Sequence, residues 1–140
     1  QHIVDSGVPV MGHLGLTPQS VHQLGGFRVQ GQEEAASEVL KTQAKKLEDA
    51  GCFAVVLECV PADLAAQISK NLRISVIGIG AGADVDGQVL VLQDMLGMNR
   101  DFQPKFLRRF AQGHEWVLSA LNEFSSEVKS GRYPNEQEVY

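Results

Sequence analysis

An apolar run at residues 53–60 places the strongest constraint on the fold of this 140-residue chain. Its side chains are almost all hydrophobic until a single carboxylate, Glu58, comes near its end. This composition is typical of a strand in a parallel sheet, because such a strand is buried on both faces. Amphipathic segments that fit helices flank the run, at residues 33–50 and after Pro61. The pattern indicates an α/β fold in which helices connect parallel strands.

Shorter segments before and after this unit extend the same alternation. Residues 8–11 and 75–79 are short runs of β-branched and other apolar side chains that suit strands, and residues 1–6 suit a helix that Gly7 ends. Glycines and polar side chains punctuate residues 12–32, so we predict a long loop there.

The second half of the chain is richer in helical patterns. Residues 105–112 and 115–130 have apolar side chains at helical spacing, and we predict a helix in each. The apolar run at residues 89–92 fits either a strand or a turn of buried helix. Residues 134–140 are acidic and contain a proline, and we expect a flexible tail there unless a partner holds it.

Length and composition limit the classes of protein that the chain can belong to. We expect one domain over residues 1–140, because 44% of the residues are hydrophobic and 21% are charged. The net charge of -5 argues against nucleic acid as a partner. No apolar run approaches the roughly 20 residues that a membrane span needs. A (β/α)₈ barrel needs about 250 residues, so the chain fits half of such a barrel or a small open sheet.

Glu58 is the most informative single residue, because an unpaired carboxylate is costly to bury in an apolar strand. One interpretation is a general base at the carboxyl end of a parallel strand, where desolvation would strengthen it as a proton acceptor. The alternative is a structural carboxylate that pairs with a lysine or arginine or caps the helix after Pro61. We favour the base.

His13 is the second candidate, because it follows another predicted strand and would share the face of Glu58. It could instead be a loop histidine bonded to the backbone. We expect His2, His22 and His114 to be surface or structural residues. No histidine has the spacing of a metal site with other ligands. The two cysteines, Cys52 and Cys59, lack CxxC spacing, so we expect reduced thiols.

Two further patterns admit a functional interpretation. Gly78, Gly80, Gly82 and Ala83 formally match the dinucleotide-binding pattern GxGxxG/A, which requires that a helix begin at the last glycine. We prefer the interpretation that these glycines leave the backbone without side chains, so that a substrate or a neighbouring loop can approach it.

The other pattern is basic. Lys105, Arg108 and Arg109 form a cluster on a predicted helix, which fits a solvated face better than a dock for an acidic cofactor tail. Trp116 and the phenylalanines at helical spacing fit the core.

Several strings, in order and in register, resemble the ketopantoate hydroxymethyltransferase family over effectively the whole chain. They are VPVMGHLGLTPQS (residues 8–20), GGFRVQG (25–31), VLECVPADLA (56–65), VIGIGAG (76–82) and DGQVLVLQDMLG (86–97). The resemblance implies a (β/α)₈ barrel in a cytoplasmic homodecamer, of which this chain matches only the C-terminal half, about the fifth to eighth βα units.

The resemblance also implies a reaction and site residues. The family transfers a hydroxymethyl group from 5,10-methylenetetrahydrofolate to 3-methyl-2-oxobutanoate, with a divalent metal, usually Mg²⁺, and so makes ketopantoate for pantothenate and coenzyme A synthesis. By resemblance, Glu58 is the proton acceptor and His13 lines the substrate pocket. The family's metal ligands and its substrate-binding serine and lysine lie in the other half. We therefore expect no metal ligand here, and poor metal binding and negligible turnover by this chain alone.

Two other functions are kept as hypotheses. The first is a non-catalytic half-barrel fragment or assembly module that lacks the metal site. The second is a nucleotide-binding protein that uses residues 78–83. Acidic metal ligands in the preceding sequence would favour the enzyme, and nucleotide binding would favour the last hypothesis.

Overall fold

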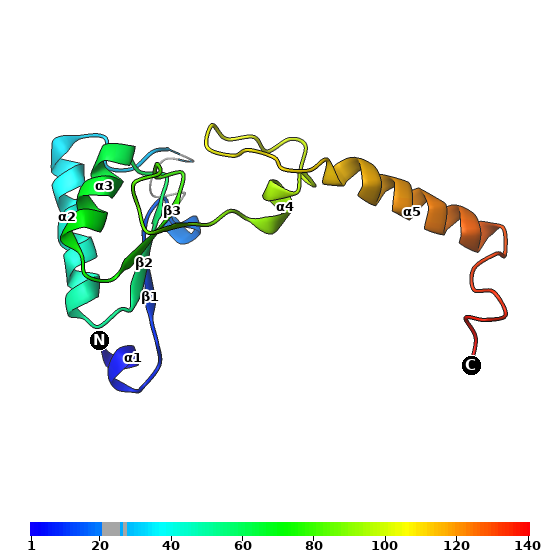
Figure 1. The fold of residues 1–140 in the computed structure, drawn as a ribbon, viewed down its shortest axis with the longest axis horizontal. Coiled ribbons are helices and arrows are strands. Elements are labelled where there is room, and N and C mark those ends of the chain that lie inside the picture. The colour runs from blue at the N-terminus through cyan, green and yellow to red at the C-terminus, as the bar shows by residue number, and fades with distance from the viewer. Residues whose placement is uncertain (21–25, 27) are drawn as a thin grey trace. The chain divides into compact units, whose positions relative to one another are not determined.

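The computed structural model describes residues 1–20, 26 and 28–140. The chain divides into two compact units, Gln1–Val89 and Leu90–Tyr140 (Figure 1). Across the described ranges, no helix is long and apolar enough to cross a membrane. The expectation of one domain over residues 1–140 stays a prediction.

The first unit contains a parallel sheet with the strand order β1-β2-β3-β4. The strands are β1 (Met11–Gly15), β2 (Ala54–Glu58), β3 (Ser75–Ile79) and β4 (Gly87–Gln88). Helices α2 (Glu34–Asp49) and α3 (Ala62–Asn71) connect the first three strands, and a short α1 (His2–Asp5) precedes them. A 3₁₀ turn, η1 (Pro18–Ser20), follows β1. The parallel α/β architecture predicted from the sequence is confirmed.

The core of this unit lies between the sheet and the two long helices, which cover the same face of the sheet (Figure 1). Val55, Leu57 and Val76 are completely buried on that face. Helices α2 and α3 supply the opposite side of the core, with the buried residues Leu40, Ala44, Leu64, Ala65 and Ile68. Because the core fills one face only, the side chains that alternate with Val55 and Leu57 point to the other face.

The position of β1 corrects the sequence-based prediction. The predicted strand at residues 8–11 lies instead at Met11–Gly15, so the predicted loop begins four residues too early. The glycines that indicated a loop have packing roles in the strand. A Cβ at Gly12 would lie 2.5 Å from a methyl carbon of Leu47 in α2. Gly15 has a φ of +92° at the end of the strand.

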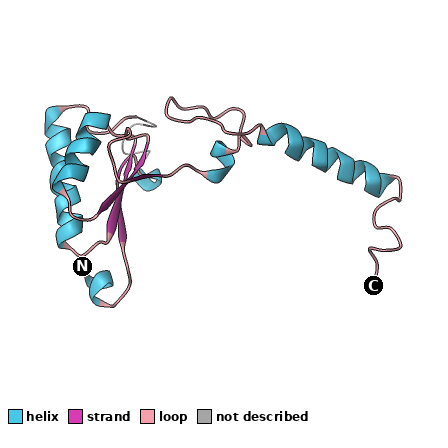
Figure 2. Cartoon of the chain, in the orientation of Figure 1, coloured by secondary structure: helices cyan, strands magenta, loops and turns pink. Residues whose placement is uncertain are grey.

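The second unit begins with α4 (Leu92–Met95) and contains the long α5 (Gly113–Lys129) as one uninterrupted helix (Figure 2). Backbone hydrogen bonds join the start of α5 and the loop before it to the end of α4. The Phe110 N–H donates to the Met95 carbonyl at 2.8 Å, and the Gly113 N–H donates to the Leu96 carbonyl at 2.7 Å. Residues 89–91 form neither of the two elements considered for them, and Leu92 begins α4.

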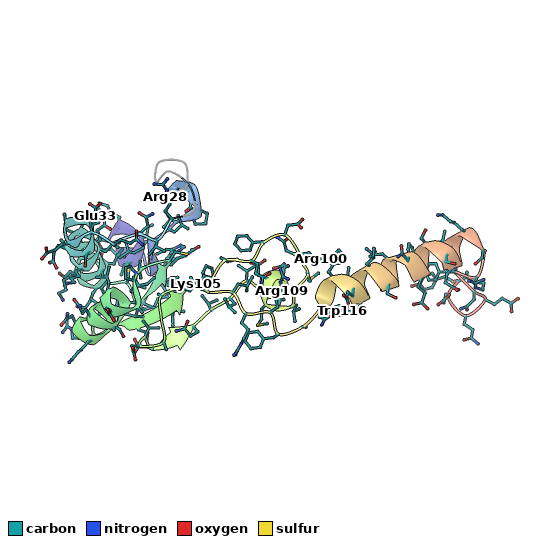
Figure 3. All side chains as sticks on the ribbon, turned by 90° about the horizontal axis from the view of Figure 1, so that it is seen from above. Arg28, Glu33, Arg100, Lys105, Arg109 and Trp116 are labelled. Atoms are coloured by element: carbon teal, nitrogen blue, oxygen red, sulfur yellow. The ribbon has the colours of Figure 1, made fainter. Side chains whose placement is uncertain are left out.

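The helix predicted at residues 105–112 is wrong, because this segment is a loop with one tight turn. Arg109 explains the difference. Its Nη2 donates to the carbonyl oxygens of Asn99, Arg100 and Phe102, at 3.1, 2.9 and 3.2 Å. Figure 3 shows Arg109 within this loop, close to Arg100. The guanidinium thus holds the loop together through its backbone carbonyls. Because the segment is not a helix, the predicted solvated helix face does not exist.

The core role predicted for Trp116 is also wrong in the structure. Trp116 is 54% exposed, and Leu121 and Phe124 are 60% and 55% exposed. The apolar stripe on α5 is as predicted, but within the second unit, which is described completely, no second long helix packs against it. Phe124 contacts Tyr133 edge to face, with ring centroids 5.4 Å apart.

Candidate active site

Glu58 is the last residue of β2 and lies at the carboxyl end of the parallel sheet. It pairs with Gly15 of β1 on one side and with Ile79 of β3 on the other. Its side chain alternates with that of the buried Leu57 and so points to the face that α2 and α3 leave open. This is the edge at which parallel α/β proteins place ligands.

His13 provides the partner of the Glu58 side chain. It pairs in register with Val56, two residues before Glu58, so His13 and Glu58 lie on the same face of the sheet. Its Nε2 is 2.9 Å from Oε2 of Glu58. The side chains are 36% and 22% exposed, so both reach solvent. The structure therefore brings together the two candidates that the sequence analysis singled out.

The backbone around Glu58 is held by the segment that follows β1. The Leu16 N–H donates to the Glu58 carbonyl at 2.9 Å, and the Gln30 N–H donates to the carbonyl of Cys59 at 2.8 Å. Cys59 adopts a φ of +50°, which is uncommon for a residue with a side chain. The strand thus ends in a fixed turn directly after the carboxylate.

The thiol of Cys59 does not compete with Glu58 as a reactive group. Burial raises the pKa of Cys59 above its ordinary value of 9.0, and the negative charge of Glu58 raises it further. The thiol is therefore protonated at neutral pH and a poor nucleophile. Both Cys59 and the buried Cys52 are free, as predicted.

A cavity of about 660 Å³ lies beside His13 in the first unit. Its walls come from β1, from the residues around Thr17 and Gln30, and from the first half of α2, including Ala36 and Val39. Among the described residues, β1 pairs only with β2, so its other edge borders this cavity.

The remaining histidines lie elsewhere. His2 is exposed in α1, and His114 lines a separate cavity of about 560 Å³ in the second unit, together with Arg100 and Arg109. His22 lies outside the described residues. Within the described part of the chain, no three His, Cys, Asp or Glu side chains are grouped so that they could hold a metal ion.

The glycine-rich stretch after β3 does not form a dinucleotide site of the usual kind. A turn and the short β4 follow Gly82, and no helix begins there. A Cβ on Gly82 would lie 2.5 Å from the Cβ of Ala62, at the start of α3. The missing side chain thus lets the stretch pack against α3, and the structure gives no support to the nucleotide-binding hypothesis.

A comparison with protein-family models decides the family. The model described as ketopantoate hydroxymethyltransferase matches residues 1–136. The chain belongs to this family. The resemblance inferred from the sequence strings is therefore confirmed for nearly the whole chain.

Individual relatives support the same assignment. A protein named 3-methyl-2-oxobutanoate hydroxymethyltransferase from Bdellovibrio bacteriovorus is 59% identical over all 140 residues, which cover 53% of its length. Proteins of the same name from Francisella tularensis subsp. tularensis and Coxiella burnetii are 54% and 57% identical, over 100% and 96% of this chain. The chain spans about half the length of these ketopantoate hydroxymethyltransferase relatives.

Proposed function

We propose that the protein containing this chain transfers a hydroxymethyl group from 5,10-methylenetetrahydrofolate to 3-methyl-2-oxobutanoate and so makes 2-dehydropantoate, also called ketopantoate, for pantothenate and coenzyme A synthesis. The observation that carries the proposal is Glu58, at the carboxyl end of β2, on the open face of the sheet and paired with His13, in a chain of this family. Water supplies the hydroxyl oxygen, and tetrahydrofolate is the second product.

Glu58 has the chemistry of a general base for this reaction. C3 of 3-methyl-2-oxobutanoate carries one hydrogen and lies next to the C2 carbonyl. When a Glu58 oxygen takes that proton, the electrons of the C3–H bond move into a C2–C3 double bond, and an enolate forms. C3 of the enolate is then the nucleophile that forms the new bond to the one-carbon unit. The two C–N bonds that join this carbon to the folate break, water supplies its hydroxyl group, and the C3 proton and the second water proton end on the two nitrogens of tetrahydrofolate. A positioned base contributes about 10²- to 10⁴-fold to such a step.

The rest of the protein would complete the fold around this site. We propose a (β/α)₈ barrel in which the strands of this chain make up about half of the eight. The cavity lined by β1 and by Ala36 and Val39 of α2 borders the side of the sheet on which the preceding strand and helix would pack in such a barrel. Closing the sheet would also cover the open face that bears Glu58 and Ile77.

The divalent metal that the family implies does not fit the residues described here, because they contain no group of three or more suitable side chains. We propose that its ligands come from the part of the longer protein that this chain does not span. Cytoplasmic location, assembly as a homodecamer, and the binding of a small keto acid and folate remain parts of the same proposal.

The non-catalytic alternative is not favoured. An assembly module would have no need of a carboxylate held at the carboxyl end of the sheet, whereas the structure pairs Glu58 with His13 there. The relatives that match this chain are also named as the enzyme.

Product formation by the full-length protein tests the proposal. With both substrates and Mg²⁺, the wild-type protein should make ketopantoate. Glu58→Gln should lower kcat by about 10²- to 10⁴-fold. Glu38→Gln is the matched control, because Glu38 is an exposed carboxylate in α2 whose ion pair, among the described residues, is with Lys41. Wild-type protein that makes no ketopantoate, or Glu58→Gln protein with normal kcat, would overturn it.

A further inference from the structure

We propose that His13 is a positioning residue: it holds one oxygen of the Glu58 carboxylate so that the other oxygen can take the substrate proton. This inference rests on the proposed function. It goes beyond the pocket-lining role that the family resemblance implies for His13, because it assigns the imidazole to the base and not to the substrate.

The backbone fixes the two residues relative to each other before their side chains meet. Gly15 pairs with Glu58 and His13 pairs with Val56, in neighbouring parallel strands. The Leu16 N–H then donates to the Glu58 carbonyl at 2.9 Å. Register and turn together therefore fix the two backbones so that the imidazole can reach the carboxylate.

The chemistry of the pair sets the direction of the hydrogen bond. A base must be ionised before it reacts, and an ionised carboxylate only accepts hydrogen bonds. His13 Nε2 must therefore carry the hydrogen that it donates to Oε2 of Glu58, across 2.9 Å. Within the described part of the chain, Oε1 of Glu58 has no hydrogen-bond partner. Oε1 is thus the oxygen free to accept a proton from C3.

The benefit of this arrangement is orientation. The Glu58 side chain has several rotamers, and at 22% exposure it is not confined by packing alone. A base that is misplaced by about 1 Å can lose about 10² in rate. Because His13 acts on the base, its loss should affect the chemical step and leave substrate affinity nearly unchanged.

The length of the side chain at position 13 provides the test. A glutamine amide nitrogen can occupy the place of Nε2, whereas an asparagine amide nitrogen corresponds to Nδ1 and falls short. In the full-length protein, His13→Asn should lower kcat by about 10²-fold with the KM for the keto acid changed less than about threefold. His13→Gln should recover most of kcat. His2→Gln, at an exposed histidine in α1, is the control and should match the wild type.

A double variant separates this inference from the proposed function. If His13 acts through Glu58, His13→Asn should cause no further loss of kcat in protein that already carries Glu58→Gln. A rise in KM with unchanged kcat, equal losses in the Asn and Gln variants, or an additive loss in the double variant would each overturn the positioning role while Glu58 stays the base. Normal kcat for Glu58→Gln alone would overturn the proposed function itself.

Discussion

At the scale of single residues, Gly15 allows the ends of β1 and β2 to come together. Its φ of +92° favours glycine, and a Cβ there would collide with the carbonyl oxygen of Glu58. That carbonyl is the one that accepts the Leu16 N–H. Gly15 therefore supports the backbone from which the Glu58 side chain projects.

Gly15→Ala should destabilise the protein by about 2 kcal/mol or more, because backbone strain and a collision with fixed backbone add together. Gly7→Ala is the matched control, since Gly7 has a similar φ of +84° and nothing within 4 Å of a Cβ. Urea unfolding of both variants measures the difference. Equal losses of unfolding free energy would show that the collision at Gly15 does not matter.

The two site residues could be found from the sequence for a physical reason. A carboxylate in an apolar strand is costly, and that cost singled out Glu58. The pairing with His13 was less visible, because Gly12 and Gly15 suggested a loop and concealed that His13 lies in a strand. Strand register, which brings His13 beside Val56, depends on contacts between distant segments that no local pattern contains.

At the scale of elements, Glu48 joins the end of α2 to the connection between α3 and β3. Its side chain is only 4% exposed. Oε1 accepts the Arg73 backbone N–H at 2.5 Å, and Oε2 accepts a hydrogen bond from Lys45. The Lys45 ammonium, followed by the Arg73 N–H, holds the pKa of Glu48 below its ordinary value of 4.5. The ionised form of Glu48 thus stabilises the folded state.

The sign of this effect gives a prediction. Because the pKa of Glu48 is lower in the folded state, its contribution is complete at neutral pH and is lost as the pH falls from 4.5 through the folded value. Glu48→Gln should therefore have a lower urea midpoint than the wild type at pH 7, and the gap should narrow at pH 3. Glu38→Gln, at a 64% exposed carboxylate, should show little change. A gap that widens in acid would contradict this assignment.

The sequence predicted elements best where burial alone determines them. The apolar β2 and the amphipathic α2 lie where predicted. The hydrophobic pattern of each segment reflects its burial: β2 is apolar almost throughout, whereas α2 has apolar residues along one side only. The failure at residues 105–112 has the opposite cause. Their helical spacing is genuine, but Arg109 binds three backbone carbonyls of the preceding loop, and that interaction between segments replaces the helix.

At the scale of the whole molecule, the chain spans about half the length of its relatives, and its described residues contain no group of metal ligands. We predict that the 140-residue chain alone makes no ketopantoate above background and shows no saturable binding of Mg²⁺ or Mn²⁺ by titration calorimetry. Under the same conditions, the full-length protein should make ketopantoate and should bind the metal ion saturably. Normal turnover by the short chain would contradict the division of the site between the two halves.

The central claim is that Glu58 removes the C3 proton of the keto acid, and hydrogen exchange measures this step directly. Full-length protein is incubated in D₂O with 3-methyl-2-oxobutanoate and Mg²⁺ but no one-carbon donor, and the C3 proton signal is followed by NMR. The wild-type protein should exchange this proton, whereas Glu58→Gln should slow the exchange by about 10²-fold or more and still bind the keto acid. Exchange at the wild-type rate in Glu58→Gln would contradict the claim.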